Sequence, residues 1–349
     1  MDFKQLREKI EELNFQILDL LNQRAALAIA IGEKKQEQGL NFYDPARESM
    51  MLKHLLEKNS GPFPDEVVKV LFKEIFKASM ELMQEKKNQN LLVSRQHKPQ
   101  DTKIRFGDLE IGGPEPVIIA GPCSVESLEQ MEAIATFLKD RGIRCLRGGA
   151  YKPRTSPYAF QGLKEEGLKI LSEISRRFGL LIVTEVLDPR ELEKVSEVAD
   201  ILQIGARNMY NYELLKEVGR LSKPVLLKRG FMATIEEFLL SAEYIIGQGN
   251  QEIILCERGI RTFENWTRNT LDISAVPILK QESHLPVIVD ISHSSGRKDI
   301  ADWIARAAIA AGADGLMVEV HNQPQVALSD GGQQLDFTEF EKLLKAIKS

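Results

Sequence analysis

Eight short apolar runs alternate with segments of helical spacing between residues 101 and 349. Apolar runs of this length that alternate with helices are typical of parallel strands in α/β proteins. Eight such units over roughly 250 residues predict a (β/α)8 barrel, or TIM barrel. A doubly wound open sheet is the alternative, but no Gly-x-Gly-x-x-Gly turn follows the first run. The predicted strands lie within 116–122, 144–150, 180–186, 200–206, 224–230, 252–258, 286–292 and 314–320.

The N-terminal part of the chain has a different pattern, with no strand-like run. Apolar residues recur at spacings of three and four, or their sum, from Leu6 to Ile31, which predicts one long amphipathic helix. A second helix is expected from Pro45, with Asp44 as its N-cap, and a third from Asp65 onwards. The chain is therefore expected to hold an all-α domain of three helices (1–88), a polar linker (89–100) and the α/β barrel domain (101–349).

Composition and charge exclude several classes of protein. The formal net charge is −5, which argues against non-specific nucleic-acid binding, because that binding depends on a basic surface. No apolar stretch approaches the roughly 18 residues that a membrane span requires. The N-terminus is charged and does not resemble a signal peptide, and three cysteines are too few for a disulfide scaffold. We expect a globular protein of the reducing cytoplasm.

Catalytic residues of such barrels lie at the carboxyl ends of the strands, so the residues after each apolar run are candidates. Four of them offer a thiolate, an imidazole and two carboxylates. This mixed set suits a borderline divalent metal such as Mn, Fe, Co or Zn, and suits Ca or Mg poorly. The cysteine is equally consistent with a small buried residue, so both interpretations stay open at this point. The candidates are Cys123, His293, Glu319 and Asp330.

A second group at the strand ends is cationic. Six basic side chains at one rim of an acidic protein would repel one another unless an anion binds there. Arginine matches phosphate and carboxylate groups bidentately, and lysine adds a point charge. With a metal alongside, the group predicts a barrel enzyme that joins or cleaves small phosphorylated carbonyl compounds. The six residues are Arg147, Lys152, Arg154, Arg207, Lys228 and Arg258.

These segments resemble the 3-deoxy-D-arabino-heptulosonate 7-phosphate (DAHP) synthases with a compact barrel. The shared motifs are GPCS, LRGGAYKPRTSP, TEV, IGARN, LKRG, ERGIRTF, DISHSSG, VEVH and LSDGG, spread over residues 101–349. The resemblance implies condensation of phosphoenolpyruvate with erythrose 4-phosphate, the first step of the shikimate pathway to aromatic amino acids. KPRTS separates the chain from a related synthase that uses arabinose 5-phosphate and has an Ala-Asn-Arg-Ser type of sequence. A phosphoenolpyruvate-using sugar-acid synthase of that kind is the alternative function.

The resemblance also assigns the site residues. It implies that the four metal ligands are those named above, with manganese the expected ion and iron, cobalt or zinc as alternatives. It places the phosphorylated aldehyde on Arg154 and Thr155. The residues that match the phosphoenolpyruvate site are Arg147, Lys152, Glu185, Ala206, Arg207, Lys228 and Arg258.

Two of these residues are expected to act in the chemistry. Lys152 is the expected proton donor to the aldehyde oxygen, which the metal would polarise. Glu185 is expected to position or deprotonate the attacking water. The alternative role for Glu185 is that of a salt-bridge partner that orients Lys228 or Arg207.

Arg24 lies on the apolar stripe of the first helix, where a charge is costly unless it is paired. Lys35 follows on the same face, roughly 16 Å further along the helix, so both side chains could hold a small dianion. Arg7 precedes Arg24 by roughly 25 Å, too far for one small ligand to bridge within a single helix. If Arg7 serves the same site, it must come from a second chain; otherwise it is a solvated surface residue.

This domain resembles the all-helical chorismate mutase, an intertwined dimer whose sites take residues from both chains. Arg24 and Lys35 are its expected catalytic residues, because the mutase stabilises charge at the breaking ether oxygen. One departure matters: Met83 stands where a well-known mutase has a glutamine that faces this oxygen, and Gln84 is one place off. We therefore expect a ligand site with weak turnover. The matching positions are Arg7, Arg24, Lys35, Asp44, Arg47, Glu48 and Ser79.

The sequence thus predicts a bifunctional enzyme, with a DAHP synthase barrel and a mutase domain that senses chorismate or prephenate and inhibits the barrel. One alternative is a purely regulatory helical domain without mutase turnover, and another is a dimerisation element only. By resemblance the protein is expected to be a homo-oligomer, a tetramer containing helical-domain dimers.

Overall fold

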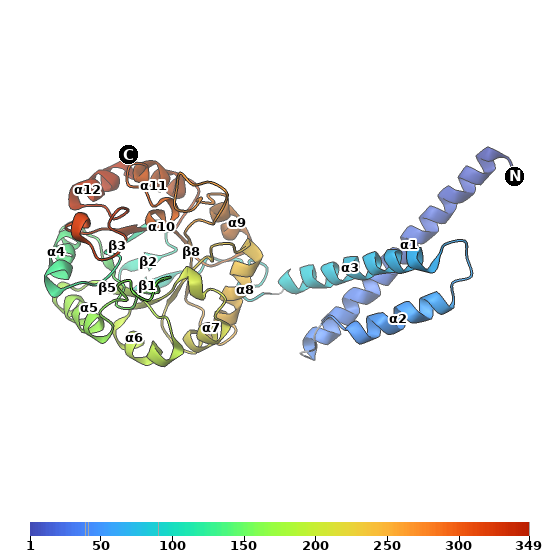
Figure 1. The fold of residues 1–349 in the computed structure, drawn as a ribbon, viewed down its shortest axis with the longest axis horizontal. Helices are drawn as coiled ribbons and strands as arrows, with labels where there is room; N and C mark the ends of the chain where they lie inside the picture. The colour runs from blue at the N-terminus through green and yellow to red at the C-terminus, as the bar shows by residue number, and fades with distance from the viewer. Residues whose placement is uncertain (39, 41, 90, 349) are drawn as a thin grey trace. The chain divides into compact units, whose positions relative to one another are not determined.

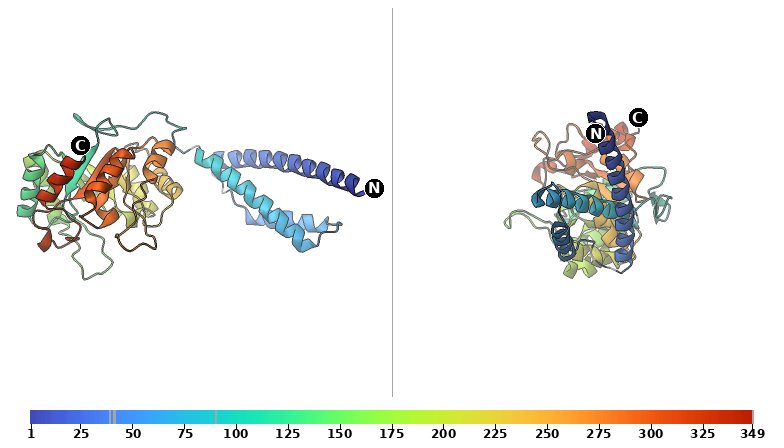
Figure 2. Two further views of the ribbon diagram at one scale, coloured as in Figure 1. Left: turned by 90° about the horizontal axis from the view of Figure 1, so that it is seen from above. Right: turned by 90° about the vertical axis from the view of Figure 1, so that its right-hand side faces the viewer.

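The computed structural model describes residues 1–38, 40, 42–89 and 91–348, and side chains 36, 37 and 84–89 lie outside the description. The chain forms two compact units, Met1–Leu91 and Leu92–Ser349. The first unit is helical and the second is a barrel with an outer layer of helices (Figures 1 and 2). No described helix is long and apolar enough to cross a membrane.

The helical unit consists of α1 (Phe3–Glu37), α2 (Pro45–Glu57) and α3 (Asp65–Gln89), and α3 packs against both other helices. The Asp44 side chain caps α2 as predicted, since it accepts a hydrogen bond from the backbone N–H of Arg47. Helix α1 continues through Gly32, where a Cβ atom would lie 2.8 Å from Cγ of Met83. The glycine therefore permits close approach of α1 and α3.

The apolar stripe at the start of α1 is not covered by the described part of this chain. Its leucine and isoleucine side chains are between 47% and 63% exposed. An uncovered stripe of this length is unfavourable in water, since each buried apolar side chain is worth roughly 1.5–3 kcal/mol. The residues are Leu6, Ile10, Leu13, Ile17 and Leu20.

The second unit is a closed barrel of parallel strands (Figure 1). Each strand pairs with its sequence neighbours, and β10 closes the ring by pairing with β3 and β9. The strands are β3 (Val117–Gly121), β4 (Cys145–Arg147), β5 (Leu181–Glu185), β6 (Ile201–Ile204), β7 (Val225–Lys228), β8 (Ile253–Glu257), β9 (Val287–Asp290) and β10 (Gly315–Glu319).

Helices surround this ring and cover the outer faces of the strands (Figure 1). The longer ones have apolar residues on the side that faces the sheet, as expected for amphipathic helices in an α/β protein. The helices are α4 (Leu128–Lys139), α5 (Glu165–Phe178), α6 (Leu192–Val198), α7 (Tyr212–Gly219), α8 (Ile235–Ile246), α9 (Ala275–Glu282), α10 (Ile291–Ser295), α11 (Ala301–Ala310) and α12 (Phe337–Ala346), with 3-10 turns at Pro189–Glu191, Ala206–Asn208 and Pro324–Val326.

A short hairpin closes the end of the barrel at which the strands begin. It consists of β1 (Ile104–Phe106) and β2 (Leu109–Ile111), which pair antiparallel. Ile104 and Ile111 are fully buried in one apolar cluster with inward-facing strand residues such as Val117 and Ile119. The interior is therefore packed from this end, which leaves the opposite end for chemistry.

Residues 92–100 differ from the expected polar linker, because they pack onto the barrel. The backbone N–H groups of Leu92 and Val93 donate to the two carboxylate oxygens of Glu243, at 3.0 and 3.1 Å. His284 Nε2 lies 2.8 Å from the Leu92 carbonyl oxygen, and Val93 is fully buried. The polar composition of this segment does not indicate these contacts. Residue 90, inside the predicted linker, lies outside the described residues.

Candidate active site and effector pocket

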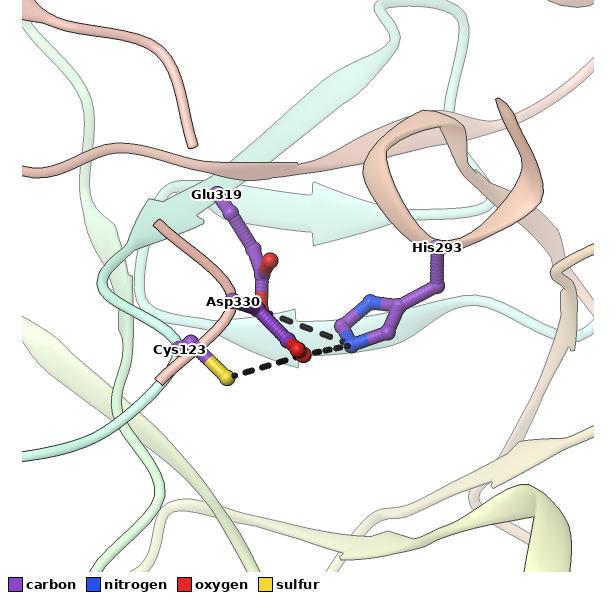
Figure 3. A group of neighbouring side chains, drawn as sticks. All are labelled: Cys123, His293, Glu319 and Asp330. Carbon is purple, nitrogen blue, oxygen red and sulfur yellow. Dashed lines mark hydrogen bonds and ion pairs between the residues drawn. The ribbon is translucent and has the colours of Figure 1, made fainter. Parts of the chain in front are cut away.

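Four side chains from three places in the sequence meet at the carboxyl ends of β3, β9 and β10 (Figure 3). Their ligand atoms all lie within 4.8 Å of one another. His293 Nε2 is 3.4 Å from Glu319 Oε1 and 3.9 Å from an oxygen of Asp330, and Cys123 Sγ is 3.4 Å from the same oxygen. The barrel thus brings the four predicted metal ligands together.

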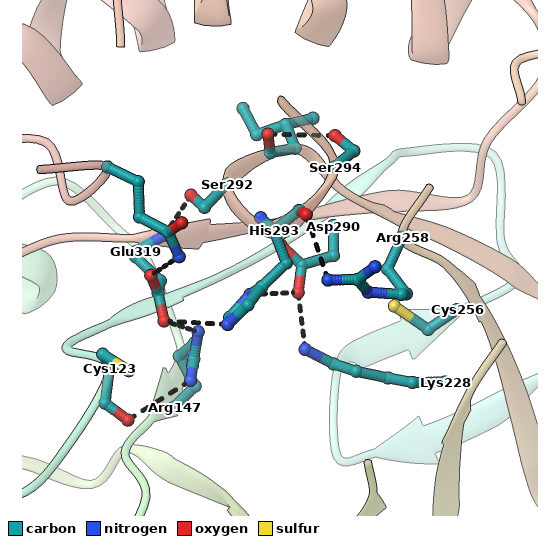
Figure 4. Close-up of polar contacts among 12 residues, drawn as sticks. Cys123, Arg147, Lys228, Cys256, Arg258, Asp290, Ser292, His293, Ser294 and Glu319 are labelled. Atoms are coloured by element: carbon teal, nitrogen blue, oxygen red, sulfur yellow. Dashed lines mark hydrogen bonds and ion pairs between the residues drawn. The ribbon is translucent and has the colours of Figure 1, made fainter. Parts of the chain in front are cut away.

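Local backbone structure positions two of the four predicted ligands, His293 and Asp330. His293 lies on the short helix α10, which Asp290 caps through a hydrogen bond from the His293 backbone N–H. The other Asp290 oxygen lies 2.8 Å from His293 Nδ1, so Nε2 is directed at the cluster (Figure 4). Asp330 has a φ of 52°, a left-handed conformation that aspartate tolerates better than most residues.

The protonation states follow from burial and neighbouring charge. Burial, reinforced by Glu319, raises the pKa of the Cys123 thiol to about 12. Burial also lowers the pKa of His293 below 6.5, so the imidazole is neutral at pH 7. Burial alone would raise the pKa of Glu319, but His293 and Arg147 outweigh it and the pKa is lowered. Arg268 and His293 likewise lower the pKa of Asp330 to about 2.

These residues fit a divalent transition metal. A neutral imidazole, two carboxylates and one thiol offer nitrogen, oxygen and sulfur donors around one point. The thiol must lose its proton to bind, because thiolate is the ligand form of cysteine. The chemistry of the donor set therefore agrees with the prediction, without identifying the metal.

Beside the cluster lies a pocket whose wall carries all six predicted cations. Arg147 is buried and donates to Glu319 Oε1 at 2.8 Å, yet its Nε has no hydrogen-bond partner among the described residues. Lys152 Nζ donates to the Cys123 carbonyl oxygen at 2.9 Å, so its ammonium group lies next to the metal ligands. The guanidinium groups of Arg207 and Arg258 lie 5.4 and 4.8 Å from the centre of the Phe231 ring.

Two of these cations, Arg147 and Arg258, are not fully satisfied for their burial. Burial lowers the pKa of the Arg258 guanidinium from its usual value, although Asp290 opposes the change. A buried donor without a partner, such as Arg147 Nε, costs roughly 1–3 kcal/mol. An anion in the pocket would relieve both penalties, so the electrostatics favour an anionic ligand.

Glu185 also lines the pocket, with Ala206 close by. Its carboxylate accepts from Gln203 Nε2 at 3.2 Å and lies against Gly205, where a Cβ atom would be 2.0 Å from Oε1. Within the described residues no ion pair joins Glu185 to Lys228 or Arg207, and Lys228 pairs instead with Asp290. The alternative role as their salt-bridge partner therefore has no support in this geometry.

The predicted aldehyde-phosphate residues lie at the outer part of the same pocket. Arg154 is fixed by a 3.0 Å hydrogen bond from Nε to the Phe160 carbonyl oxygen and by a contact from Nη2 to Ser329 Oγ. Thr155 is exposed beside it. All predicted barrel residues thus lie in or beside one cavity.

Sequence reasoning missed several residues that shape the site. Asp290 orients His293, and its position three residues earlier in DISH was the one available signal. Arg268 lies 3.2 Å from Asp330 and donates to Gln333 Oε1 at 2.7 Å, and Gln333 Nε2 donates to Glu319 at 2.5 Å. No spacing rule marks these polar loop residues. The missed residues are Gln203, Phe231, Arg268, Asp290, Ser329, Gln333 and Gln334.

A separate pocket in the helical unit gathers six of the seven residues predicted there. Arg24 Nη1 donates to Ser79 Oγ at 2.5 Å, and Lys35 Nζ donates to the Phe42 carbonyl oxygen at 2.8 Å. Met83 lines the pocket, whereas the side chain of Gln84 lies outside the described residues. Arg7 does not line it and lies against the Phe3 ring, 4.3 Å from the ring centre. The residues gathered are Arg24, Lys35, Asp44, Arg47, Glu48 and Ser79.

A closed barrel with a four-ligand cluster beside a cationic pocket defines the class of barrel enzymes that act on small anionic substrates. Residues 83–349 match the DAHP synthetase I family, and residues 6–84 match chorismate mutase type II. The chain belongs to the DAHP synthetase I family. It carries a DAHP synthase domain, which is a transferase, and a chorismate mutase domain, which is an isomerase.

Known proteins agree with this assignment. The chain is 61% identical over 257 residues to a phospho-2-dehydro-3-deoxyheptonate aldolase of Thermotoga maritima, covering 74% of this chain and 76% of that protein. A crystal structure of the Thermotoga maritima enzyme superposes with a TM-score of 0.72 at 60% identity, covering 74% of this chain and 76% of the other. A 2-dehydro-3-deoxyphosphooctonate aldolase of Geobacter sulfurreducens is 32% identical over 267 residues, covering 71% of this chain and 97% of that protein. The predicted fold class and pair of enzyme domains are therefore confirmed.

Proposed function

We propose that the barrel condenses phosphoenolpyruvate with erythrose 4-phosphate and water to give DAHP and phosphate, in a reaction that depends on a divalent metal, with manganese as the ion. The observation that supports this most strongly is Lys152, whose ammonium group lies beside the metal-ligand cluster and also lines the cationic pocket. The metal, held by Cys123, His293, Glu319 and Asp330, would supply Lewis-acid polarisation of the aldehyde carbonyl.

Residues of the chain bind the substrates and transfer the protons. Arg147, Arg207, Lys228 and Arg258 bind the phosphate and carboxylate of phosphoenolpyruvate, and Ala206 forms part of the wall. C3 of phosphoenolpyruvate forms a bond to the aldehyde carbon, while Lys152 gives a proton to the aldehyde oxygen. Glu185 positions the water and takes its proton as the water oxygen bonds to C2. The bond from C2 to the phosphate oxygen then breaks, and the C2 hydroxyl gives its proton to the departing phosphate, which completes the ketone.

Arg154 and Thr155 bind the phosphate of the second substrate and set its distance from the metal. The relative from Geobacter sulfurreducens is named for an eight-carbon product, so the length of the aldehyde is the property to test. We expect loss of phosphoenolpyruvate absorbance with erythrose 4-phosphate and little with arabinose 5-phosphate. Faster turnover with arabinose 5-phosphate would instead establish the alternative sugar-acid synthase.

We propose that the helical unit binds chorismate and prephenate, converts the first to the second weakly, and inhibits the barrel when occupied. The pocket that contains Arg24 and Lys35 supports this role, because two cations suit a dicarboxylate. Met83 favours weak turnover, since a thioether donates no hydrogen bond. Mutase turnover by the full-length protein at the rate of a dedicated mutase would contradict the proposal that the helical unit is mainly regulatory. Binding of neither ligand would reduce the unit to a dimerisation element.

We further propose that two helical units form a dimer within a homotetramer. The uncovered apolar stripe of α1 and the position of Arg7 outside the pocket support this arrangement. The test is to co-express Arg7→Ala chains with Arg24→Ala chains. If Arg7 completes the partner's site, half of the dimers are mixed, and each mixed dimer carries one intact site. About a quarter of the prephenate sites should therefore be regained. Arg7→Ala dimers with full binding would show that Arg7 is a surface residue.

A further inference from the structure

We propose that Ser329 is a positioning residue that connects the metal ligand Cys123 to the aldehyde-phosphate residue Arg154. The inference rests on the proposed function, because both sites belong to it. Ser329 is buried, 3% exposed, and its hydroxyl oxygen lies 2.9 Å from Cys123 Sγ. Arg154 Nη2 donates a hydrogen bond to the same hydroxyl oxygen.

Chemistry fixes the direction of the hydrogen bond from Arg154, whereas either the Ser329 hydroxyl or the Cys123 thiol can donate in the other contact while the thiol keeps its proton. A guanidinium group carries only donors, so Ser329 must accept from Arg154. A serine hydroxyl has one hydrogen, and this hydrogen is then available to the sulfur of Cys123. When Cys123 is a thiolate it can only accept, and the chain of bonds then runs from the Arg154 N–H through the Ser329 O–H to the Cys123 sulfur.

Neighbouring hydrogen bonds hold Ser329 and Cys123 in place. The side chain of Gln334 is fully buried and bonds to both partners. Its Oε1 accepts from the Cys123 backbone N–H at 2.9 Å, and its Nε2 donates to the Ser329 carbonyl oxygen at 2.7 Å. The contact between hydroxyl and sulfur is thus supported at both ends and does not depend on a freely rotating surface serine.

This geometry has a consequence for the metal-bound state. A thiolate is a stronger hydrogen-bond acceptor than a thiol, because hydrogen bonds to ionised groups are roughly twice as strong. A hydroxyl already polarised by Arg154 would donate to the thiolate of the metal-bound state and fix its orientation, as partners of metal ligands generally do. Occupancy of the phosphate subsite at Arg154 is thereby connected to the electron density on the sulfur.

The test uses full-length protein stripped of metal and titrated with Co²⁺, whose bond to a thiolate gives a charge-transfer band in the near ultraviolet. We expect Ser329→Ala to weaken Co²⁺ binding roughly 10- to 100-fold, the range typical for lost partners of metal ligands. We also expect its band to move to lower energy, because the sulfur loses a hydrogen bond. The KM for erythrose 4-phosphate rises, and Ser329→Thr, which keeps the hydroxyl, restores all three values.

Ser124→Ala is the matched control. This neighbouring serine is also fully buried, but its hydroxyl donates to Glu126 at 3.1 Å. It should leave the band and the Co²⁺ affinity unchanged. Arg154→Met gives a second variant that does not disturb the buried serine. It should move the band in the same direction by a smaller amount, since the hydroxyl is less polarised.

The outcomes separate the two claims. If the unmodified protein gives no thiolate band with Co²⁺, the proposed metal site fails and the role of Ser329 fails with it. If the unmodified protein gives the band, but Ser329→Ala and Arg154→Met leave its energy and the Co²⁺ affinity unchanged, the role of Ser329 is overturned while the metal site stands.

Discussion

Asp290 Oδ2 lies 2.8 Å from His293 Nδ1 and also accepts from Lys228 Nζ. One buried carboxylate therefore orients a proposed metal ligand and neutralises a cation of the adjacent pocket (Figure 4). Its pKa is held well below the usual value by His293 and Lys228 in spite of burial, so it is ionised at pH 7. The proposed metal and anion sites thus share a residue.

Replacing this carboxylate tests that relationship. Asp290→Asn should weaken metal binding about 10- to 100-fold and raise the KM for phosphoenolpyruvate, because His293 and Lys228 both lose their ionised partner. Isothermal titration of the metal-free protein and steady-state kinetics give the two values. Asp299→Asn, which alters an exposed residue paired with Arg297, is the control. An effect on metal affinity alone would show that Lys228 does not need Asp290.

Metal binding should release one proton at pH 7 to 8. The pKa of Cys123 is raised to about 12, so the thiol is protonated before the metal binds and must ionise. The pKa values of His293, Glu319 and Asp330 are all lowered, so these groups have no proton to release at that pH. Metal affinity should therefore rise about tenfold per pH unit in this range. Calorimetry in buffers of different ionisation enthalpy counts the protons, and a count of zero would remove Cys123 from the ligand set.

Gly205 is needed for the placement of Glu185. A methyl group at position 205 would lie 2.0 Å from Glu185 Oε1, so Gly205→Ala must displace the carboxylate. The backbone at residue 205 is extended, with φ −70°, and accepts alanine without strain. We expect kcat to fall about 100-fold, the lower range for lost general-base catalysis, with little change in the thermal midpoint. At Gly61 a Cβ atom would meet only Asn59 Oδ1, at an ordinary contact distance of 3.9 Å, so Gly61→Ala should behave as the unmodified protein. Retained turnover in Gly205→Ala would remove Glu185 from the proposed water step.

The pair formed by Arg229 and Glu257 should contribute far more to stability than surface ion pairs do. Both side chains are buried, with Arg229 Nη1 donating to Glu257 at 2.8 Å, and Gly259 N–H donates to the same carboxylate at 2.6 Å. Glu257→Gln leaves Arg229 partly uncompensated and should lower the free energy of unfolding by about 3 kcal/mol. Glu341→Gln, which removes a half-exposed partner of Arg141, should cost less than about 1 kcal/mol. Chemical denaturation of both variants compares them directly, and equal losses would argue against the buried pair.

Restoring a donor at position 83 should raise mutase turnover. Met83 lines the pocket of Arg24 and Lys35, where a glutamine amide could donate to the ether oxygen of chorismate. We expect Met83→Gln to raise kcat at least tenfold, followed as the loss of chorismate absorbance. Met83→Leu, which adds no donor, is the control. An unchanged rate in Met83→Gln, with prephenate still bound, would mean that position 83 does not face the reacting oxygen.

Much of this site could be predicted from the sequence because strand ends are marked by the ends of apolar runs. Cys123, His293 and Glu319 follow such runs directly, and barrel closure brings β3, β9 and β10 to one rim. Pairs like Ser329 and Cys123, or Arg268 and Asp330, join loops that are distant in sequence. Their contacts depend on tertiary geometry that no period or spacing records.

In the helical unit, too, the sequence predicts local structure but not the contacts between distant segments. The period of three and four gave α1, and Arg24 stood out as a charge on an apolar face. Helix α1 continues through Gly32, and the close approach of the Met83 side chain to this glycine is a contact that a local pattern does not contain. The segment 92–100 looked like a linker because its anchors, Glu243 and His284, lie far along the chain.

We propose that synthase activity in the barrel depends on a metal at the cluster beside Lys152. We also propose that the helical unit inhibits this activity when chorismate or prephenate binds. The most direct test measures phosphate release from phosphoenolpyruvate plus erythrose 4-phosphate after chelator treatment and Mn²⁺ add-back, with and without prephenate. The account predicts turnover that is lost with chelator, returns with Mn²⁺ and is suppressed by prephenate. Full turnover in the stripped protein would contradict the metal site, and metal-restored turnover indifferent to prephenate and chorismate would contradict the sensor.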